Sequence, residues 1–262
     1  MTDARGFSGD RFVYRLVVRE PKPDFKVTLN GANPTVNAGS GQSFSVTVDR
    51  IDEFDDNVQV DITGLPPGFS ISAPLVIEAG HAEAKGTINA AIDAPQPNET
   101  NSAVSKVTAM AMIGGKTVTK DVNNFGNIKL GEKPKLFVSL EPYTETSATN
   151  TDFHTSGKAL ELTIAPGQTI PASLKIKRNG HEDLVTFFVE NLPHGVIVDN
   201  IGLNGVLIPK GENARQIFLN AAKWVPETDR PCYAIEQQAG RQTSLPVMLH
   251  VRKPGAKVAA SK

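Results

Sequence analysis

The densest group of carboxylates lies in the stretch "DRIDEFDDN", at residues 49–57. Its members are Asp49, Asp52, Glu53, Asp55 and Asp56, with Asp61 close by. Carboxylate oxygens are the ligands that Ca²⁺ prefers, but the spacing differs from an EF-hand and no glycine marks its sharp turn. The pattern favours a solvent-exposed hairpin turn in which Asp and Asn side chains cap their own backbone. Calcium binding by Asp49–Asp56 stays open as the alternative.

Histidine is a common metal ligand, and five occur in the chain. They are His81, His154, His181, His194 and His250. No two have the i, i+4 spacing of a zinc-binding helix, and none lies beside Cys232 in the sequence. We expect surface or strand histidines and no metal site.

Two residues are candidate nucleophiles, Ser40 and Cys232. Ser40, in "AGSGQ", lacks the G-x-S-x-G elbow and its strand-turn-helix context. Cys232, in "RPCYAI", has no local partner signature, which favours a small, partly buried hydrophobe. Paired catalytic carboxylates, a phosphate loop and a dinucleotide fingerprint are also missing from the sequence. We therefore predict no catalytic residues, no cofactor and no enzymatic activity.

Three aromatic residues of the C-terminal half are candidates for a sugar-stacking platform: Phe218, Trp224 and Tyr233. Aromatic residues make up only 6% of the chain. Where they are this scarce, each is more typical of a core anchor. The sequence favours the core and leaves the platform as the alternative.

The charges of the chain nearly cancel, with 27 Lys and Arg against 28 Asp and Glu. A net charge of −1 predicts no nucleic-acid partner, because such binding rests on clustered cations. The tail carries only cations: Arg252, Lys253, Lys257 and Lys262. We expect residues 253–262 to be a disordered solubilising end, with contact to a polyanion as the alternative. No apolar run reaches the roughly 18 residues of a membrane helix, and the single cysteine allows no intrachain disulfide.

The elements that would position these residues are short strands. Apolar side chains recur at every second position in residues 24–30 and 43–50, as in half-buried strands. About seven such runs lie between residues 24 and 122, a number typical of an immunoglobulin-like sandwich. Gly114 and Gly115 separate the last two runs, as in a tight hairpin. A second series spans residues 135–253, in which only "RPCYAIEQQAGR", 230–241, is a candidate short helix or long loop.

The two series can be superposed, because "GLPPG" at residues 64–68 is echoed by "NLPHG" at 191–195. Leu65 and Leu192 are expected to plug the end of a sandwich. Gly68 and Gly195 are expected to take positive φ, so that the chain crosses from one sheet to the other. A repeat of this length predicts duplicated whole domains rather than a solenoid.

Residues 24–122, and more weakly 134–252, resemble the Ig-like repeats of large secreted proteins from planctomycete-type bacteria. The resemblance rests on "VTVDRIDEFDDNVQVDITGLPPGFSISAPLVIEAGHAEAKGTINA". The second copy departs from the pattern, since Pro67 is replaced by His194 and the acidic turn by "NGHED". The resemblance implies exported, modular proteins.

The N-terminal stretch "RFVYRLVVR", residues 11–19, alternates like a strand and precedes the stiff linker "EPKP". It resembles the closing strand of a bacterial pre-peptidase C-terminal domain. Gly9, Tyr14, Arg15 and Leu16 match that family's motif. The family consists of accessory modules, and the resemblance implies that the chain is a fragment lacking its native N-terminus and export signal.

These observations predict an all-β chain of two tandem Ig-like antiparallel β-sandwiches. The expected divisions are a leftover strand in 1–20, sandwiches in 24–130 and 134–252, and the basic tail. We expect a non-catalytic structural, adhesive or spacer module of an exported bacterial protein, located outside the cell or on its surface. Its partner would be a protein or a polysaccharide surface. The alternative is an accessory carbohydrate- or substrate-binding module of a secreted hydrolase. The sequence does not predict strand order, inter-domain angle or oligomeric state.

Overall fold

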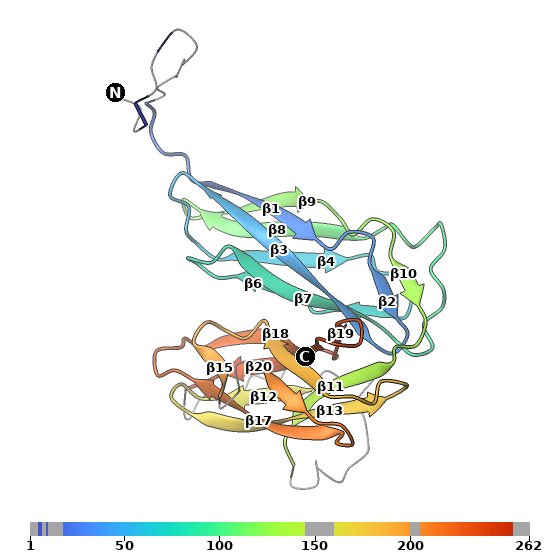
Figure 1. The fold of residues 1–262 in the computed structure, drawn as a ribbon. Helices are drawn as coiled ribbons and strands as arrows, with labels where there is room; N and C mark the ends of the chain where they lie inside the picture. The colour runs from blue at the N-terminus through green and yellow to red at the C-terminus, as the bar shows by residue number, and fades with distance from the viewer. Residues whose placement is uncertain (1–4, 7–8, 10–17, 145–159, 200–204, 254–262) are drawn as a thin grey trace.

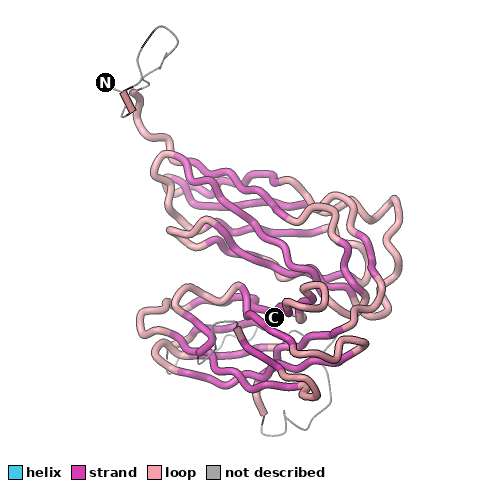
Figure 2. The backbone as a smooth tube through the Cα atoms, in the orientation of Figure 1, coloured by secondary structure: helices cyan, strands magenta, loops and turns pink. Residues whose placement is uncertain are grey.

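The computed structural model describes residues 5–6, 9, 18–144, 160–199 and 205–253. Every regular element in these residues is a β-strand, as Figure 2 shows. The strands form two stacked sandwiches, one above the other in Figure 1. The prediction of an all-β, tandem Ig-like fold is confirmed.

The first sandwich consists of two four-stranded antiparallel layers and a small parallel pair. One layer has the order β1 (Asp24–Asn30), β3 (Gly41–Ile51), β7 (Glu83–Ala90), β5 (Phe69–Ile71). The other has the order β6 (Leu75–Ile77), β4 (Val58–Thr63), β8 (Lys106–Ile113), β9 (Lys116–Val122). The parallel pair is β2 (Thr35–Asn37) with β10 (Lys129–Gly131).

The second sandwich repeats this order. One layer has the order β11 (Leu136–Pro142), β13 (Thr169–Arg178), β17 (Ala214–Ala221), β15 (Val196–Asp199). The other has the order β16 (Val206–Ile208), β14 (Val185–Glu190), β18 (Thr228–Glu236), β20 (Val247–Val251), with β12 (Glu161–Ile164) parallel to β20. The short β19 (Gln242–Thr243) branches from β18. The two four-stranded layers of the first sandwich thus have counterparts in the second, which confirms the predicted tandem of Ig-like sandwiches.

Each sandwich has its own hydrophobic core. The first core takes its inward side chains from alternate positions, such as Phe25, Val27 and Leu29 on β1. The second core contains Leu174 and Phe187, and the two clusters share no member. Burial of these alternating apolar side chains drives both folds, at about 25 cal/mol per Å² removed from water.

The repeated corners behave as predicted. Gly68 has φ 78° and Gly195 has φ 87°. After the first corner the chain passes from β4 in one layer to β5 in the other, and after the second from β14 to β15. Leu65 and Leu192 are half-buried and pack against the adjacent cores.

The hairpin predicted at Gly114 and Gly115 is also confirmed, since both have positive φ between the paired strands β8 and β9. The first sandwich contains three short strands that alternation did not reveal, β2, β5 and β10. Three residues each are too few to display a period of two. Most of the predicted strand at 11–19 lies outside the described residues, as do His154 and the tail from residue 254. Val18 and Arg19 are described and are not in a strand.

The candidate helix or long loop at 230–241 is wrong over most of its length. Residues 228–236 form β18, a central strand paired with β14 on one side and β20 on the other. From Arg230 to Glu236 every residue is buried. Cys232 and Ala234 belong to the second core, while the intervening Tyr233 has carboxylates of both sandwiches near it. A strand covered on both faces shows no alternation, so the sequence hid its period.

Candidate binding groove between the sandwiches

The two sandwiches are joined through their backbones. β19 of the second pairs antiparallel with β3 of the first, with Gln242 opposite Gln42 and Thr243 opposite Gly41. This pairing makes one hydrogen-bonded path of strands through both sandwiches. Gly41 is required by the close approach, because a Cβ there would lie 2.2 Å from Thr243 Oγ1.

A buried carboxylate holds β19 in this position. Glu236 is fully buried, and its Oε2 accepts hydrogen bonds from the backbone N–H groups of Gln238 (2.7 Å) and Ala239 (2.6 Å). Its Oε1 accepts one from the N–H of Gln242 at 2.7 Å. The carboxylate thus shapes the turn that presents β19 to β3.

Polar side chains continue the junction outward from β19. Thr87 hydrogen-bonds Thr243, and Asn89 Nδ2 donates to Ser244 O at 3.1 Å. Farther along β7, Lys85 Nζ lies 2.8 Å from Glu190 Oε2. Thr87, Asn89 and Lys85 lie on the outer face of the first sandwich, opposite its core.

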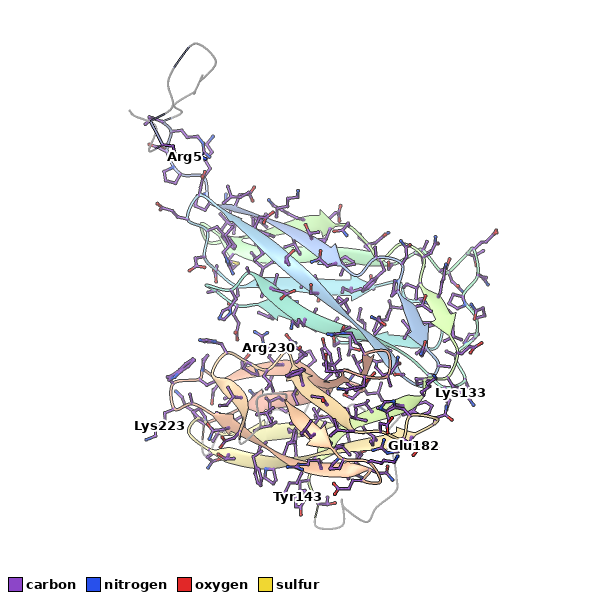
Figure 3. All side chains as sticks on the ribbon, viewed as in Figure 1. Arg5, Lys133, Tyr143, Glu182, Lys223 and Arg230 are labelled. Carbon is purple, nitrogen blue, oxygen red and sulfur yellow. The ribbon has the colours of Figure 1, made fainter. Side chains whose placement is uncertain are left out.

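Arg230 makes the most buried ionic contact of the junction, and Figure 3 places it between the sandwiches. Its Nη2 lies 2.8 Å from Glu78 Oε1, and its side chain is only 7% exposed. Its Nη1 also lies 3.3 Å from Asn191 Oδ1, and Asn191 Nδ2 donates to Pro231 O at 2.9 Å. Arg230 therefore joins the loop between β6 and β7 to the second corner.

Beside these contacts lies an open groove of about 470 Å³. The first sandwich contributes the polar side chains of Glu78, His81, Glu83 and Lys85. The second contributes Arg230, Ile197 and the corner from Asn191 to Val196. A volume of this size falls within the roughly 300–1,000 Å³ of ligand-binding clefts.

Three rings form a row beside the groove, whose lining includes His81 and His194 but not Trp224. The rings of His81 and His194 have centroids 4.7 Å apart, and His194 and Trp224 have centroids 5.0 Å apart. Trp224 lies against Gly195, where a Cβ would be 2.5 Å from Cη2. The indole is 61% exposed, the largest exposed fraction of any apolar side chain described in the second sandwich.

The proposed platform of Phe218, Trp224 and Tyr233 is wrong. Tyr233 is fully buried at the junction. Burial, reinforced by Glu190 and Glu83, raises the pKa of its phenol. Phe218 is 40% exposed on β17, away from the groove lining. The favoured expectation of burial therefore holds for Tyr233 alone, since Trp224 is exposed beside the groove and Phe218 lines a separate cleft of about 290 Å³.

The acidic loop uses its side chains to cap backbone. Asp55 Oδ1 accepts from Gly80 N at 2.7 Å, Asn57 Oδ1 from Ala79 N at 2.8 Å, and Asp56 Oδ1 from Asn57 N at 2.7 Å. Asp52 pairs with Arg19, whose hydrogen bond holds the pKa of that carboxyl below its ordinary value. The expectation that these side chains cap their own turn is confirmed for Asp56 alone, because Asp55 and Asn57 cap the loop between β6 and β7. Within the described ranges, no group of three His, Cys, Asp or Glu side chains is placed to hold a metal ion.

The candidate nucleophiles are both inaccessible. Cys232 is fully buried and its Sγ lies 3.4 Å from Val247 O. Burial raises the pKa of the thiol to about 12, so the reactive thiolate is scarce at neutral pH. Ser40 is 5% exposed, on the turn before β3.

The remaining histidines lie apart from the groove. His250, on β20, has its Nδ1 2.6 Å from Asp229 Oδ1. His181 lies in the turn after β13, where its carbonyl accepts a hydrogen bond from Arg178. Sequence reasoning did not bring His81, His194 and Trp224 together, because His81 lies more than a hundred residues before the other two and such a separation carries no local signal. The second corner, with its unusual histidine, was the one visible pointer.

No protein-family model matches this sequence, and no curated protein matches it. Among solved structures, domains 4 and 5 of the S-layer protein SbsC are similar at 15% identity and a TM-score of 0.28, covering 89% of this chain and 99% of that one. The D0-D1 domain of intimin is similar at 11% identity and a TM-score of 0.26, with 86% and 97% covered. A titin Ig tandem is similar at 9% identity and a TM-score of 0.23, with 89% and 98% covered. At such values these similarities do not bear on what this chain binds.

None of the residues that the structure describes forms a helix long and apolar enough to cross a membrane.

Proposed function

We propose that this chain is a non-catalytic structural and adhesive segment of an exported bacterial protein. Residues 24–130 and 134–252 act as two Ig-like modules that are held as one rigid unit. The unit spaces its neighbours and presents the groove between the modules. The observation that carries the proposal is the strand pairing of β19 with β3 across the junction.

Rigidity is the unusual property of this tandem. Domains in one chain move relative to each other by default unless their interface is large or specific. Here, backbone pairing and the buried Arg230–Glu78 pair must both break before the modules can rotate. Removing one partner of a buried ion pair costs about 3–5 kcal/mol, because the other charge is left uncompensated.

The non-catalytic assignment is supported by the state of the candidate nucleophiles. Cys232 is enclosed and its thiol pKa is raised to about 12. The extracellular location is supported by the likeness of residues 24–122 to secreted Ig-like repeats. The second candidate function, an accessory carbohydrate- or substrate-binding module of a secreted hydrolase, is favoured by one observation. Trp224 stands exposed beside a polar groove, against the lining residues His194 and Gly195.

Spin labels test the rigid unit. Cysteines introduced at the exposed Lys116 and Lys210 report one distance across the modules, since Cys232 is too buried to label. We expect a single narrow distance distribution that broadens in Gly41→Leu and Arg230→Ala. Arg215→Ala, an exposed arginine on β17, is the matched control and should leave it narrow. A broad distribution in the unaltered chain refutes the rigid unit.

Two further measurements test the rest of the proposal. The pure chain should hydrolyse nothing in broad peptidase and glycosidase panels. Beads coated with it should bind bacterial surface polysaccharide or envelope protein, and beads coated with the Gly41→Leu variant should bind less. Hydrolysis by the pure chain contradicts the non-catalytic assignment, and binding that the variant leaves unchanged contradicts a role for the junction.

A further inference from the structure

We propose that the groove between the sandwiches binds an uncharged oligosaccharide segment, with one sugar ring stacked on Trp224. This inference rests on the proposed function and names the ligand class of its binding surface. Three independent features carry it: an exposed indole, a charge-balanced polar lining, and a buried donor without a partner.

The indole is held as a flat platform. One part of the ring lies against Gly195, where any side chain would collide with Cη2 and Cζ2 at 2.5 and 2.8 Å. His194 contacts the ring at a tilt of 48°. These contacts fix the ring while 61% of the side chain stays in solvent. An exposed aromatic face matches the C–H face of a pyranose, which is apolar over an area similar to one ring.

The lining of the groove selects against charged ligands. Glu78 and Glu83 are matched by Lys85 and Arg230, so the formal charges cancel when the histidines are neutral. A balanced lining gives no net field to attract an anion or a cation. The same side chains offer carboxylate acceptors and N–H donors, which suit the hydroxyl groups of an uncharged sugar.

Arg230 has one hydrogen-bond donor, its Nε, that is left for a ligand. The residue is 6% exposed, and its buried Nε has no hydrogen-bond partner among the described residues. Buried donors in native proteins are nearly always satisfied by protein, water or ligand. The hydroxyl of Tyr233, at the same junction, is also buried without a partner there. Of these two residues only Arg230 lines the groove, so its Nε is the donor available to a ligand there.

The shape of the groove favours an internal segment of a polymer. It is open along the junction rather than enclosed, and its volume is about 470 Å³. An open cleft accepts a chain that continues in both directions, whereas a free monosaccharide would leave most of the lining uncovered.

Glycan arrays and calorimetry on the intact chain test the inference. The arms are uncharged β-linked glucan, mannan and chitin hexasaccharides, uronic-acid and sulfated oligosaccharides, and extended peptides. We expect at least one uncharged hexasaccharide to bind and no acidic sugar to bind more tightly. Trp224 is the only tryptophan of the chain, so its fluorescence should shift on binding.

Variants assign the binding to the groove. Trp224→Ala should weaken affinity at least about tenfold, the effect expected of a lost stacking ring. Phe218→Ala, which removes a partly exposed ring outside the groove, should leave affinity unchanged. Equal binding by Trp224→Ala, tighter binding of acidic sugars, or binding of peptides alone overturns the inference.

The failure of this inference is distinguishable from that of the proposed function. If no uncharged glycan binds at millimolar concentration while the spin-label distance stays narrow, the ligand class is wrong and the rigid module stands. If the distance is broad and glycans still bind through Trp224, the rigid unit is wrong and the glycan site stands.

Discussion

The two sandwiches share a strand order but differ in what covers their corners and outer faces. The first corner packs against Ala94 and Pro95, which a Cβ atom added to Gly68 would meet. The second corner packs against Trp224 and Val225, which a Cβ atom added to Gly195 would meet. The two corners thus share a backbone conformation, but small residues cover the first and an exposed indole ring covers the second.

The strongest common feature is an arginine at the end of the longest strand. Arg50 donates to the carbonyls of Asp56, Glu78 and His81, at 2.7–3.2 Å. Arg178 donates to the carbonyls of Asp183, Pro209 and Glu212 at corresponding places, and to His181. The two sandwiches therefore share the backbone framework that this arginine holds together. They differ in the surface residues that form the junction and the groove.

The largest expected loss of stability follows from removing the arginine that both sandwiches share. Arg50→Ala and Arg178→Ala should each destabilise their own sandwich by about 3 kcal/mol, because several carbonyls lose a charged donor at once. Urea unfolding followed by amide exchange in each module measures this loss. Arg215→Ala should change little. A loss in only one of the two modules would break the comparison.

The junction should show the next largest effect. Arg230→Ala leaves Glu78 without its partner and should lower the free energy of unfolding by about 2–3 kcal/mol, since Glu78 retains some contact with solvent. A double-mutant cycle with Glu78→Gln isolates the pair. If the coupling energy is near zero, the modules do not depend on this contact.

The corners provide a smaller, paired test. Gly68→Ala and Gly195→Ala should each cost about 1–2 kcal/mol, because both glycines have positive φ. Only the second should also change the fluorescence of Trp224, since the added methyl group meets the indole. Thermal melts and emission spectra measure the two effects. A spectral change in Gly68→Ala would contradict the separate packing of the corners.

The smallest expected effect is on the stability of the second sandwich at acidic pH. Partial burial raises the pKa of Asp229, but hydrogen bonds from His250 and Arg252 outweigh it and hold the pKa below its ordinary value. The resulting stabilisation is complete above the pKa of about 3.9 that the Asp229 carboxyl has in the unfolded chain. It is lost as the pH falls through the lower pKa that the carboxyl has in the folded chain. Asp229→Asn should therefore remove a component, below about 1 kcal/mol, from the acid dependence of the second sandwich only. Equal acid curves for variant and unaltered chain would refute it.

Local patterns predicted much of the fold. Alternation identified β1 and β3, since each has one face on a core and a more exposed opposite face. The paired corners predicted the positive φ of Gly68 and Gly195 from steric rules that act within a few residues. Alternation failed at β18, because both faces of that strand are covered.

The candidate site was much less predictable. Asp56 was correctly expected to cap its own turn, because that bond is local in sequence. Asp55 and Asn57 cap Gly80 and Ala79, which are 25 and 22 residues away, and the sequence did not predict those bonds. Arg230 and Glu78 carry no such sign, since their pairing depends on how two separate modules meet. Tyr233 was correctly expected to be buried, but its place between the modules rather than in a core was not predicted, because burial between modules has no local signature.

The sequence by itself determined the all-β class, the duplication and the chemistry of the turns, because these follow from alternating side chains and local backbone sterics. The tertiary structure alone decided the strand order, the pairing of β19 with β3, and the meeting of His81, His194 and Trp224. The reason is physical: a contact between distant residues depends on how preformed layers pack, and no period or motif along one chain encodes that geometry.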